Sequence, residues 1–339
     1  MKLLKSIEQV DELLCREFVN CPKGSNYTQE LQRLLEYYRC ILKEYSLDGK
    51  NSIYENVVIS NYIKRLIPCL KKLVASYAKG DLIKFNELTD WLFKDRGRKI
   101  TISAYFAKAH VEKDSLWFRA RLPKLFEKFE RKDLYHVPFE KKEEIGTNRY
   151  SLIGFPCLYL GNTLECVDIE TTRNGIKAVS CFKCLKDFDI YDFTFFSPVN
   201  NNNIIDNLIS YPIKIAVSIS LCRAGMEKDK SKPVFLEEYI VPQLILHCVI
   251  KQRRKGKPIG LSYTSVEALK NRDLHGNLSK YTNLVVPTFQ HKDSGYCSTL
   301  KYYFSMTEPK IIPFSYLNND DMPKIQSDII NMDYSQINN

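Results

Sequence analysis

The sequence predicts an α+β fold in which an N-terminal α-helical bundle precedes a mixed α+β domain. Two observations lead to this fold class. In the first hundred residues, apolar side chains recur at intervals of three and four, the period of amphipathic helices. After about residue 110, strand-like runs appear with helical segments between them, but without the regular strand–helix alternation of a parallel sheet.

Four amphipathic stretches predict the helices of the N-terminal half. They cover residues 7–19, 31–45, 61–80 and 82–94. Short helices with short connections are typical of a small bundle, and we assign residues 1–105 to an all-α domain. These stretches contain no His and no isolated pair of carboxylates, so we expect regulation or partner recognition here rather than catalysis.

Seven strand-like stretches define the second domain, which we place at residues 106–317. They are residues 116–121, 157–161, 176–182, 189–196, 259–265, 283–288 and 301–306. Helical segments at residues 204–222 and 234–252 interrupt them. Residues 318–339 are rich in Asn and Asp, and we expect them to form a loosely held polar C-terminal tail.

The composition is that of a globular protein with a basic surface. Hydrophobic residues make up 44% of the chain and charged residues 27%. The formal net charge of +10 favours anionic partners, either a nucleic acid or a phosphate-bearing small molecule. The charge does not choose between these partners, and it also fits a basic surface that only aids solubility.

Membrane, secretory and metal-binding classes are not supported by the sequence. The N-terminal residues turn polar before a signal peptide could form, and no apolar run reaches the roughly 18–20 residues of a membrane span. The cysteines lie mostly in apolar contexts, so we expect a cytoplasmic protein with reduced thiols and no membrane partner. Cys181 and Cys184 form a CxxC pair, but residues three apart on a strand face opposite sides. We expect no metal site.

Three short segments carry residues suited to ligand binding. In FRAR, strand alternation places Arg119 and Arg121 on one face, where paired guanidiniums would suit a phosphate or a carboxylate. A strand with a solvated outer face has the same pattern. In PIGLSYTSV, Ser265 stands at a strand end, where a hydroxyl can hold a ligand or form a turn. In YTNLVVP, Asn283 enters another apolar strand.

A longer segment, NRYSLIGFPCLYLGNTLECVDIE, combines a turn, a strand and a helix. It runs from Arg149 through a Gly-Phe-Pro turn to a strand that contains Tyr159. Asn162 or Thr163 can cap the helix that follows. Acidic residues, including Glu170, lie on this helix, where they could also be a solvated face.

The order of these segments resembles the RES-domain family, bacterial toxin-like proteins named for an arginine, a glutamate and a serine. RYSLIGFPCLYLG is the most specific piece. EEYIVPQLIL, PIGLSYTS and NLVVP follow in the order of longer family members that carry a helical N-terminal extension. The resemblance covers residues 116–287. Where the longer forms usually have Trp-Glu-Glu, this chain has Asp168, Ile169 and Glu170.

The resemblance implies an ADP-ribosyltransferase-like core that cleaves NAD⁺ between nicotinamide and ribose. NAD⁺ would be the substrate, with no further cofactor. The acceptor would be water, phosphate or a protein side chain, and an antitoxin protein is the implied partner of such a toxin. The implied catalytic residues are Arg119, Glu170 and Ser265, and the implied NAD-binding residues are Arg149, Tyr159 and Asn283.

The chemistry of the bond explains these residue types. Positive charge builds on the ribose as nicotinamide leaves, so a carboxylate, Glu170, would stabilise the transition state. Arg119 and Arg149 would hold the diphosphate through forked hydrogen bonds. Tyr159 would offer a flat face to nicotinamide, and the hydroxyl of Ser265 would orient it.

Two other function classes stay open at this point. The basic charge and the aromatic content of 12% fit a nucleic-acid-binding module, although no helix-turn-helix, RNP or zinc-finger signature is present. A catalytically inactive interaction protein could also keep the RES fold. The retained arginine, glutamate and serine weigh against that second class.

Overall fold

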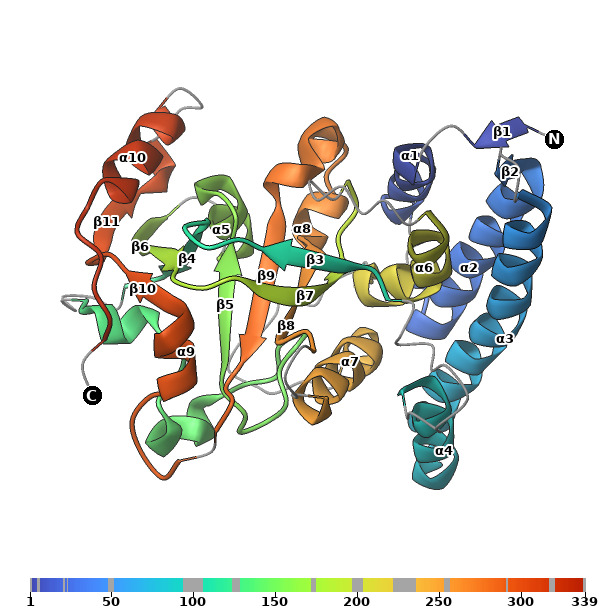
Figure 1. Ribbon diagram of the computed structural model, residues 1–339, viewed down its shortest axis with the longest axis horizontal. Coiled ribbons are helices and arrows are strands. Elements are labelled where there is room, and N and C mark those ends of the chain that lie inside the picture. Colours follow the sequence, from blue (N-terminus) through green and yellow to red (C-terminus); the bar gives the residue numbers. More distant parts are fainter. Residues whose placement is uncertain are drawn as a thin grey trace.

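The computed structural model describes residues 2–4, 7–20, 22, 24–47, 52–93, 106–123, 129–171, 175–196, 204–221, 236–252, 257–290, 292–316 and 321–337. Helices dominate one end of the molecule, and a large mixed sheet occupies the rest (Figure 1). The predicted α+β class is confirmed.

The N-terminal half is mainly helical. It contains α1 (Ile7–Phe18), α2 (Tyr27–Glu44), α3 (Ser52–Ala78) and α4 (Leu82–Phe93), which confirms the four predicted helices. The expectation of an all-α domain is wrong in one detail, because β1 (Lys2–Leu4) and β2 (Tyr45–Leu47) pair in parallel. Strands of three residues are too short to show a period. The predicted boundary at residue 105 adjoins residues 94–105, which lie outside the described ranges.

Nine strands form the large sheet. They are β3 (Lys108–Val111), β4 (Leu116–Arg121), β5 (Cys157–Gly161), β6 (Ile176–Cys184), β7 (Phe188–Phe193), β8 (Gly260–Thr264), β9 (Thr282–Pro287), β10 (Phe304–Met306) and β11 (Lys310–Pro313). The order is β10-β6-β4-β5-β9-β8-β7-β3, and β11 also pairs with β6. Only β7 and β8 run parallel; the other pairs are antiparallel.

The described residues after β3 also form six α-helices. They are α5 (Leu164–Glu170), α6 (Ile204–Ser218), α7 (Ile240–Lys251), α8 (Val266–Leu269), α9 (Ser298–Tyr303) and α10 (Asp321–Ile330). Both predicted helical segments contain a helix, α6 and α7, but the first helix ends at Ser218, and residues 219–221 are not helical. Short 3₁₀ segments cover Arg131–Leu134, Phe139–Glu144, Glu237–Tyr239, Arg272–Lys280 and Phe314–Tyr316.

Two predictions for the C-terminal region are wrong. The stretch 301–306 is a strand only in its second half, because its first half completes α9. The tail is not loosely held: α10 packs through the buried Ile329, and Ser335 forms a bridge with Met306. A few apolar residues are enough to anchor a polar segment to the sheet. The high Asn and Asp content of the segment therefore led to a wrong prediction.

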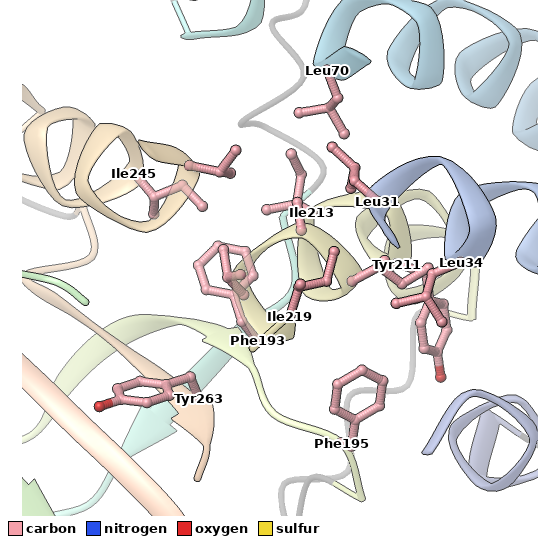
Figure 2. Packing of buried hydrophobic residues seen from close by; sticks show 14 of the residues in the cluster. Leu31, Leu34, Leu70, Phe193, Phe195, Tyr211, Ile213, Ile219, Ile245 and Tyr263 are labelled. Atoms are coloured by element: carbon pink, nitrogen blue, oxygen red, sulfur yellow. The ribbon is translucent and has the colours of Figure 1, made fainter. Parts of the chain in front are cut away.

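One continuous hydrophobic cluster joins the N-terminal helices to the sheet domain. Figure 2 shows Leu31 and Leu34 of α2 and Leu70 of α3 near side chains of α6 and α7. Ile213 of α6 and Ile245 of α7 are part of the same cluster. The helical half therefore shares a core with the sheet domain.

Tyrosine hydroxyls from α2 satisfy carbonyl groups of α6. Pro212 lies inside α6 and has no N–H, so the Leu208 carbonyl loses its usual helical donor. The Tyr38 hydroxyl donates to this carbonyl at 2.6 Å. Tyr27 donates to the Ala216 carbonyl at 2.7 Å near the end of α6.

Hydrogen bonds of the buried Asp11 also connect α1 to the sheet domain. Asp11, which is 2% exposed, accepts hydrogen bonds from the Tyr211 hydroxyl at 2.7 Å and from the Phe196 amide at 2.8 Å. Burial raises the pKa of Asp11, and the positive charge of the buried Lys214 acts against that rise. The network ties α1 to α6 and to the chain just beyond β7.

Candidate functional site

The segment from β5 to α5 sets the position of Glu170. A Cβ atom on Gly161, at the end of β5, would lie 2.8 Å from Cγ1 of Val167, so only glycine allows α5 to pack this closely. Of the two predicted capping residues, Asn162 and Thr163, it is Thr163 that begins the helix, by accepting a hydrogen bond from the Cys166 amide at 3.0 Å. Glu170 is the last residue of α5, and its place depends on both contacts.

Asn283 holds the Glu170 side chain. Its amide Nδ2 donates to Oε1 of Glu170 at 2.8 Å, across 113 positions of sequence. Asn283 lies in β9, where it pairs with Gly161 of β5 on one side and Tyr263 of β8 on the other. Asn283 is buried, whereas Glu170 is exposed. The carboxylate is thus anchored to the protein while remaining accessible at the surface.

Three tyrosines gather beside this pair. The rings of Tyr150 and Tyr263 lie 4.6 Å apart. Burial raises the pKa of the Tyr263 hydroxyl well above its usual value, and the charge of Glu170 raises this pKa further. Tyr159 and Tyr150 also raise it, by smaller amounts, whereas the positive charge of Arg149 lowers it. Tyr263 lies opposite Asn283, and Tyr159 lies opposite Val285, two residues further along β9. Strand alternation therefore places Tyr159, Tyr263 and Asn283 on one face of the sheet, and we call the three tyrosines the tyrosine cluster.

Arg149 connects the cluster to the end of α6. Its Nη1 donates to the carbonyls of Val217 at 3.0 Å and Ile219 at 2.9 Å. A cation at this position satisfies free carbonyls and complements the negative end of the helix dipole. The guanidinium also lies 5.2 Å from the ring centre of Tyr239. Arg149 therefore has a structural role beside any ligand that it could bind.

Arg119 is a half-buried cation in β4. Its Nη1 donates to the backbone carbonyl of Tyr159 at 3.2 Å. Burial, and then the charge of Arg121, lowers the pKa of Arg119 to about 9, which agrees with the prediction that the two guanidiniums converge. Among the described residues no carboxylate pairs with Arg119, so an anion could meet an uncompensated charge there.

Ser265 lies beside the cluster, but its hydroxyl is used by the fold. The residue is fully buried directly after β8. Its Oγ accepts a hydrogen bond from the Ala268 amide at 3.3 Å and so caps α8. The predicted role of Ser265 in orienting nicotinamide stays a prediction, because the contact that its hydroxyl makes is a helix cap.

The other acidic residues of α5 have structural partners or positions. Asp168 forms an ion pair with Lys177 of β6, whose side chain is fully buried and lies 4.8 Å from the ring centre of Phe314. Glu165 lies in the first turn, where its charge suits the helix dipole. Glu170 is therefore the carboxylate of α5 that faces the tyrosine cluster.

Contacts join two pairs among the six predicted residues. Glu170 contacts Asn283, and Tyr159 links this cluster to Arg119 through its carbonyl, although no described contact joins Glu170 to Arg119 directly. The sequence interpretation missed Tyr263 and Tyr239. Tyr263 could have been found, since strand alternation in PIGLSYTS places it on the same face as Leu261.

Metal and membrane sites find no support in the described part of the chain. No group of three His, Cys, Asp or Glu side chains in these ranges could hold a metal ion. Cys181 and Cys184 lie in different hydrophobic clusters, which confirms that they face opposite sides of β6. Among the described helices, none has the length and apolar character needed to cross a membrane.

Comparisons with known proteins give one informative relative. No family model and no solved structure match the chain. A Bacillus subtilis (strain 168) protein named "Putative toxin YopC" is 34% identical over 204 residues, which cover 54% of this chain and 43% of that protein. The match therefore spans less than half of the relative's length.

Proposed function

We propose that this protein cleaves NAD⁺ at the bond between nicotinamide and ribose. The observation that supports this best is the exposed carboxylate of Glu170, held by Asn283 at 2.8 Å beside the tyrosine cluster. An anchored carboxylate next to aromatic side chains is suited to a flat cationic substrate. The RES resemblance of the same segments adds to this argument.

Glu170 would act on the charge that develops during cleavage. Nicotinamide leaves as a neutral group while the ribose becomes an oxocarbenium-like cation, which a nearby carboxylate stabilises. Asn283 occupies one oxygen of Glu170, and within the described ranges no hydrogen bond occupies the second oxygen, which would face the sugar. With water as acceptor the protein would be a glycohydrolase; phosphate or a protein side chain would give phosphorolysis or ADP-ribosyl transfer.

Two arginines would meet the negative charge of the diphosphate. Arg119 supports this role because it lacks a carboxylate partner in the described ranges. Arg149 has one terminal nitrogen committed to the carbonyls at the end of α6, which leaves its remaining N–H groups for an anion. Tyr159 and Tyr263 would line the nicotinamide end. We propose that this core has an ADP-ribosyltransferase-like arrangement.

The relative in Bacillus subtilis supports a toxin role. Its name contains the word toxin, and depletion of NAD⁺ would harm any cell that could not restrain it. We propose that this chain acts within a toxin–antitoxin or defence system and that a protein antitoxin restrains it.

The test uses the purified full chain and its Glu170→Gln variant. Wild-type protein should release nicotinamide from NAD⁺, measured by chromatography. The variant keeps size and hydrogen bonding but removes the charge, so the rate should fall on the order of 10²–10³-fold. NAD⁺ affinity and thermal stability should change much less.

Glu165→Gln, on the same helix, is the matched control and should keep the full rate. The role of Glu170 is refuted if its variant folds normally and works as fast as wild type. If the wild-type chain releases no nicotinamide with water, phosphate or an added protein acceptor, the proposed activity must be abandoned.

A further inference from the structure

The second half of α3 and the turn that follows it carry an unusual run of positive charge. Residues 57–80 include five Lys or Arg and no Asp or Glu. One of these cations, Lys71, pairs with Glu36 of α2 at 3.0 Å. The other four are exposed and have no ion pair within the described ranges; they are Lys64, Arg65, Lys72 and Lys79.

A hollow of about 250 Å³ lies where α3 meets α4. Its lining residues are Lys72, Ala75, Ser76, Lys79, Asp81 and Lys84. The carboxylate of Asp81 already has a partner, because it caps α4 by accepting a hydrogen bond from the Lys84 amide at 3.0 Å. Lys84 itself pairs with Glu87 at 2.9 Å. Lys72 and Lys79 therefore leave the hollow with an excess of positive charge.

Large apolar side chains stand exposed next to this hollow. Leu82 is 56% exposed and Ile83 is 78% exposed, and both lie between Asp81 and Lys84 in the chain. Phe85, by contrast, turns inward and packs against Tyr77 of α3 with ring centres 4.9 Å apart. The inner face of α4 is thus covered, whereas apolar side chains on its outer face meet solvent, as at protein interaction sites.

We propose that the α3–α4 surface, formed by the hollow with Lys72, Lys79, Leu82 and Ile83, binds an acidic protein segment that also carries apolar side chains. The apolar groups of that segment would cover Leu82 and Ile83, and its carboxylates would pair with the two lysines. A nucleic acid would leave the apolar pair uncovered. A flat lipid surface would not fill the hollow.

The position of this surface separates it from the proposed active site. Figure 1 shows α3 and α4 at one end of the molecule's long axis, far from α5 and β5. A partner bound there would leave Glu170 uncovered. The inference does not depend on NAD⁺ cleavage, since it concerns only the binding of a partner.

A random peptide library displayed on phage, selected against the immobilised full chain, tests the inference. Enriched peptides should combine net negative charge with apolar residues, and labelled copies should bind in fluorescence anisotropy. The double variant Lys72→Glu/Lys79→Glu should weaken binding by about tenfold or more, and high salt should also weaken it. Ile83→Ser should weaken binding severalfold without changing thermal stability.

The matched control is Lys141→Glu/Lys142→Glu, which makes the same charge change at two exposed lysines elsewhere and should leave binding intact. The inference is overturned if no peptide is enriched, if the enriched peptides are basic or neutral, or if the α3 double variant binds them normally. Loss of binding to oligothymidine or to phosphatidylglycerol vesicles in that variant, with peptide binding unchanged, would assign the surface to nucleic acid or to lipid instead.

Discussion

Two carboxylates, Asp11 and Glu170, are held in opposite ways. Asp11 is buried at the contact of α1 with α6, and its oxygens accept hydrogen bonds from Tyr211 and Phe196. Glu170 is exposed at the end of α5, and its one described hydrogen bond comes from Asn283. The first group is satisfied by the fold, whereas the second keeps bonding capacity free. A carboxylate whose hydrogen bonds are all made within the fold contributes to stability. A carboxylate with remaining hydrogen-bonding capacity is available to a ligand.

The same contrast holds for two cations. Lys214 is buried near Asp11, so its charge has a compensating partner. Arg119 has no such carboxylate among the described residues. The contact between α1 and α6 therefore contains compensated charges, and strand β4 holds a charge without a described carboxylate partner. Substitutions in the two regions should accordingly separate stability from function.

The largest effect on stability is expected from Asp11→Ala. The change leaves the Tyr211 hydroxyl and the Phe196 amide buried without an acceptor, which should cost about 2–4 kcal/mol of unfolding free energy. Asp11→Asn should cost less than about 1 kcal/mol, because it keeps an acceptor and because burial already disfavours the charged carboxylate. Urea denaturation measures both. Equal losses would mean that the charge near Lys214 is what matters.

Arg119→Met should have the opposite effect, because it should weaken NAD⁺ binding with little change in stability. Burial disfavours the charge of Arg119, so its removal should leave thermal stability nearly unchanged. The affinity for NAD⁺ should fall by about tenfold to a hundredfold, since a charged hydrogen-bond donor to the diphosphate is lost. Isothermal titration calorimetry with the inactive Glu170→Gln background measures this. A destabilised variant with unchanged affinity would make Arg119 a structural residue.

His136 provides a pH-dependent test near Arg119. Its Nδ1 lies 2.7 Å from the Val137 carbonyl and its Nε2 accepts from the Cys297 amide at 2.9 Å, so the ring must be neutral. Burial lowers the pKa of His136 to about 4. Below pH about 6.5 the unfolded chain takes up a proton that the folded chain does not, so stability falls as the pH drops toward 4.

The contribution of His136 is at most about 1.4 kcal/mol per pH unit within that window. His136→Gln should reduce the slope of unfolding free energy against pH between pH 4 and 6.5, measured by urea denaturation at several pH values. An unchanged slope would show that His136 is not the titrating group.

The smallest effect is expected from Tyr38→Phe. It leaves the Leu208 carbonyl without a donor, because Pro212 cannot supply one. The expected loss is about 1–2 kcal/mol, with no change in nicotinamide release. Tyr316→Phe, at a tyrosine that is 84% exposed, is the control in thermal denaturation. A loss of catalytic rate would instead connect the helical half to the site.

Most of the sheet could be predicted because its strands are long enough to show a pattern. The stretches assigned to β4, β5, β6, β8 and β9 are strands, and their alternation or continuous burial was visible in the sequence. β3 and β11 have four residues each, which is too few for a period. The aromatic residues of 301–306 favour strands, but they also fit into α9. Tertiary packing decides here between strand and helix.

The candidate site was only partly predictable for a different reason. Segment order and motif pointed to Glu170 and Asn283, but the register of β5 against β9 that brings them together is a property of the whole sheet. Tyr263 becomes a neighbour of Asn283 through the pairing of β8 with β9. The capping use of the Ser265 hydroxyl could not be separated from a ligand-binding use by residue type alone.

Because Gly161 packs closely on α5, the length of that helix determines the direction in which its last side chain points. Each residue of an α-helix turns the next by about 100° and advances it by about 1.5 Å. With the start of α5 set by Thr163 and its packing set by Gly161, the number of residues up to Glu170 decides which direction the carboxylate faces. One inserted alanine within α5 would swing Glu170 away from Asn283 without altering a single functional side chain. Length in this segment is therefore as informative as residue identity when other sequences are compared with it.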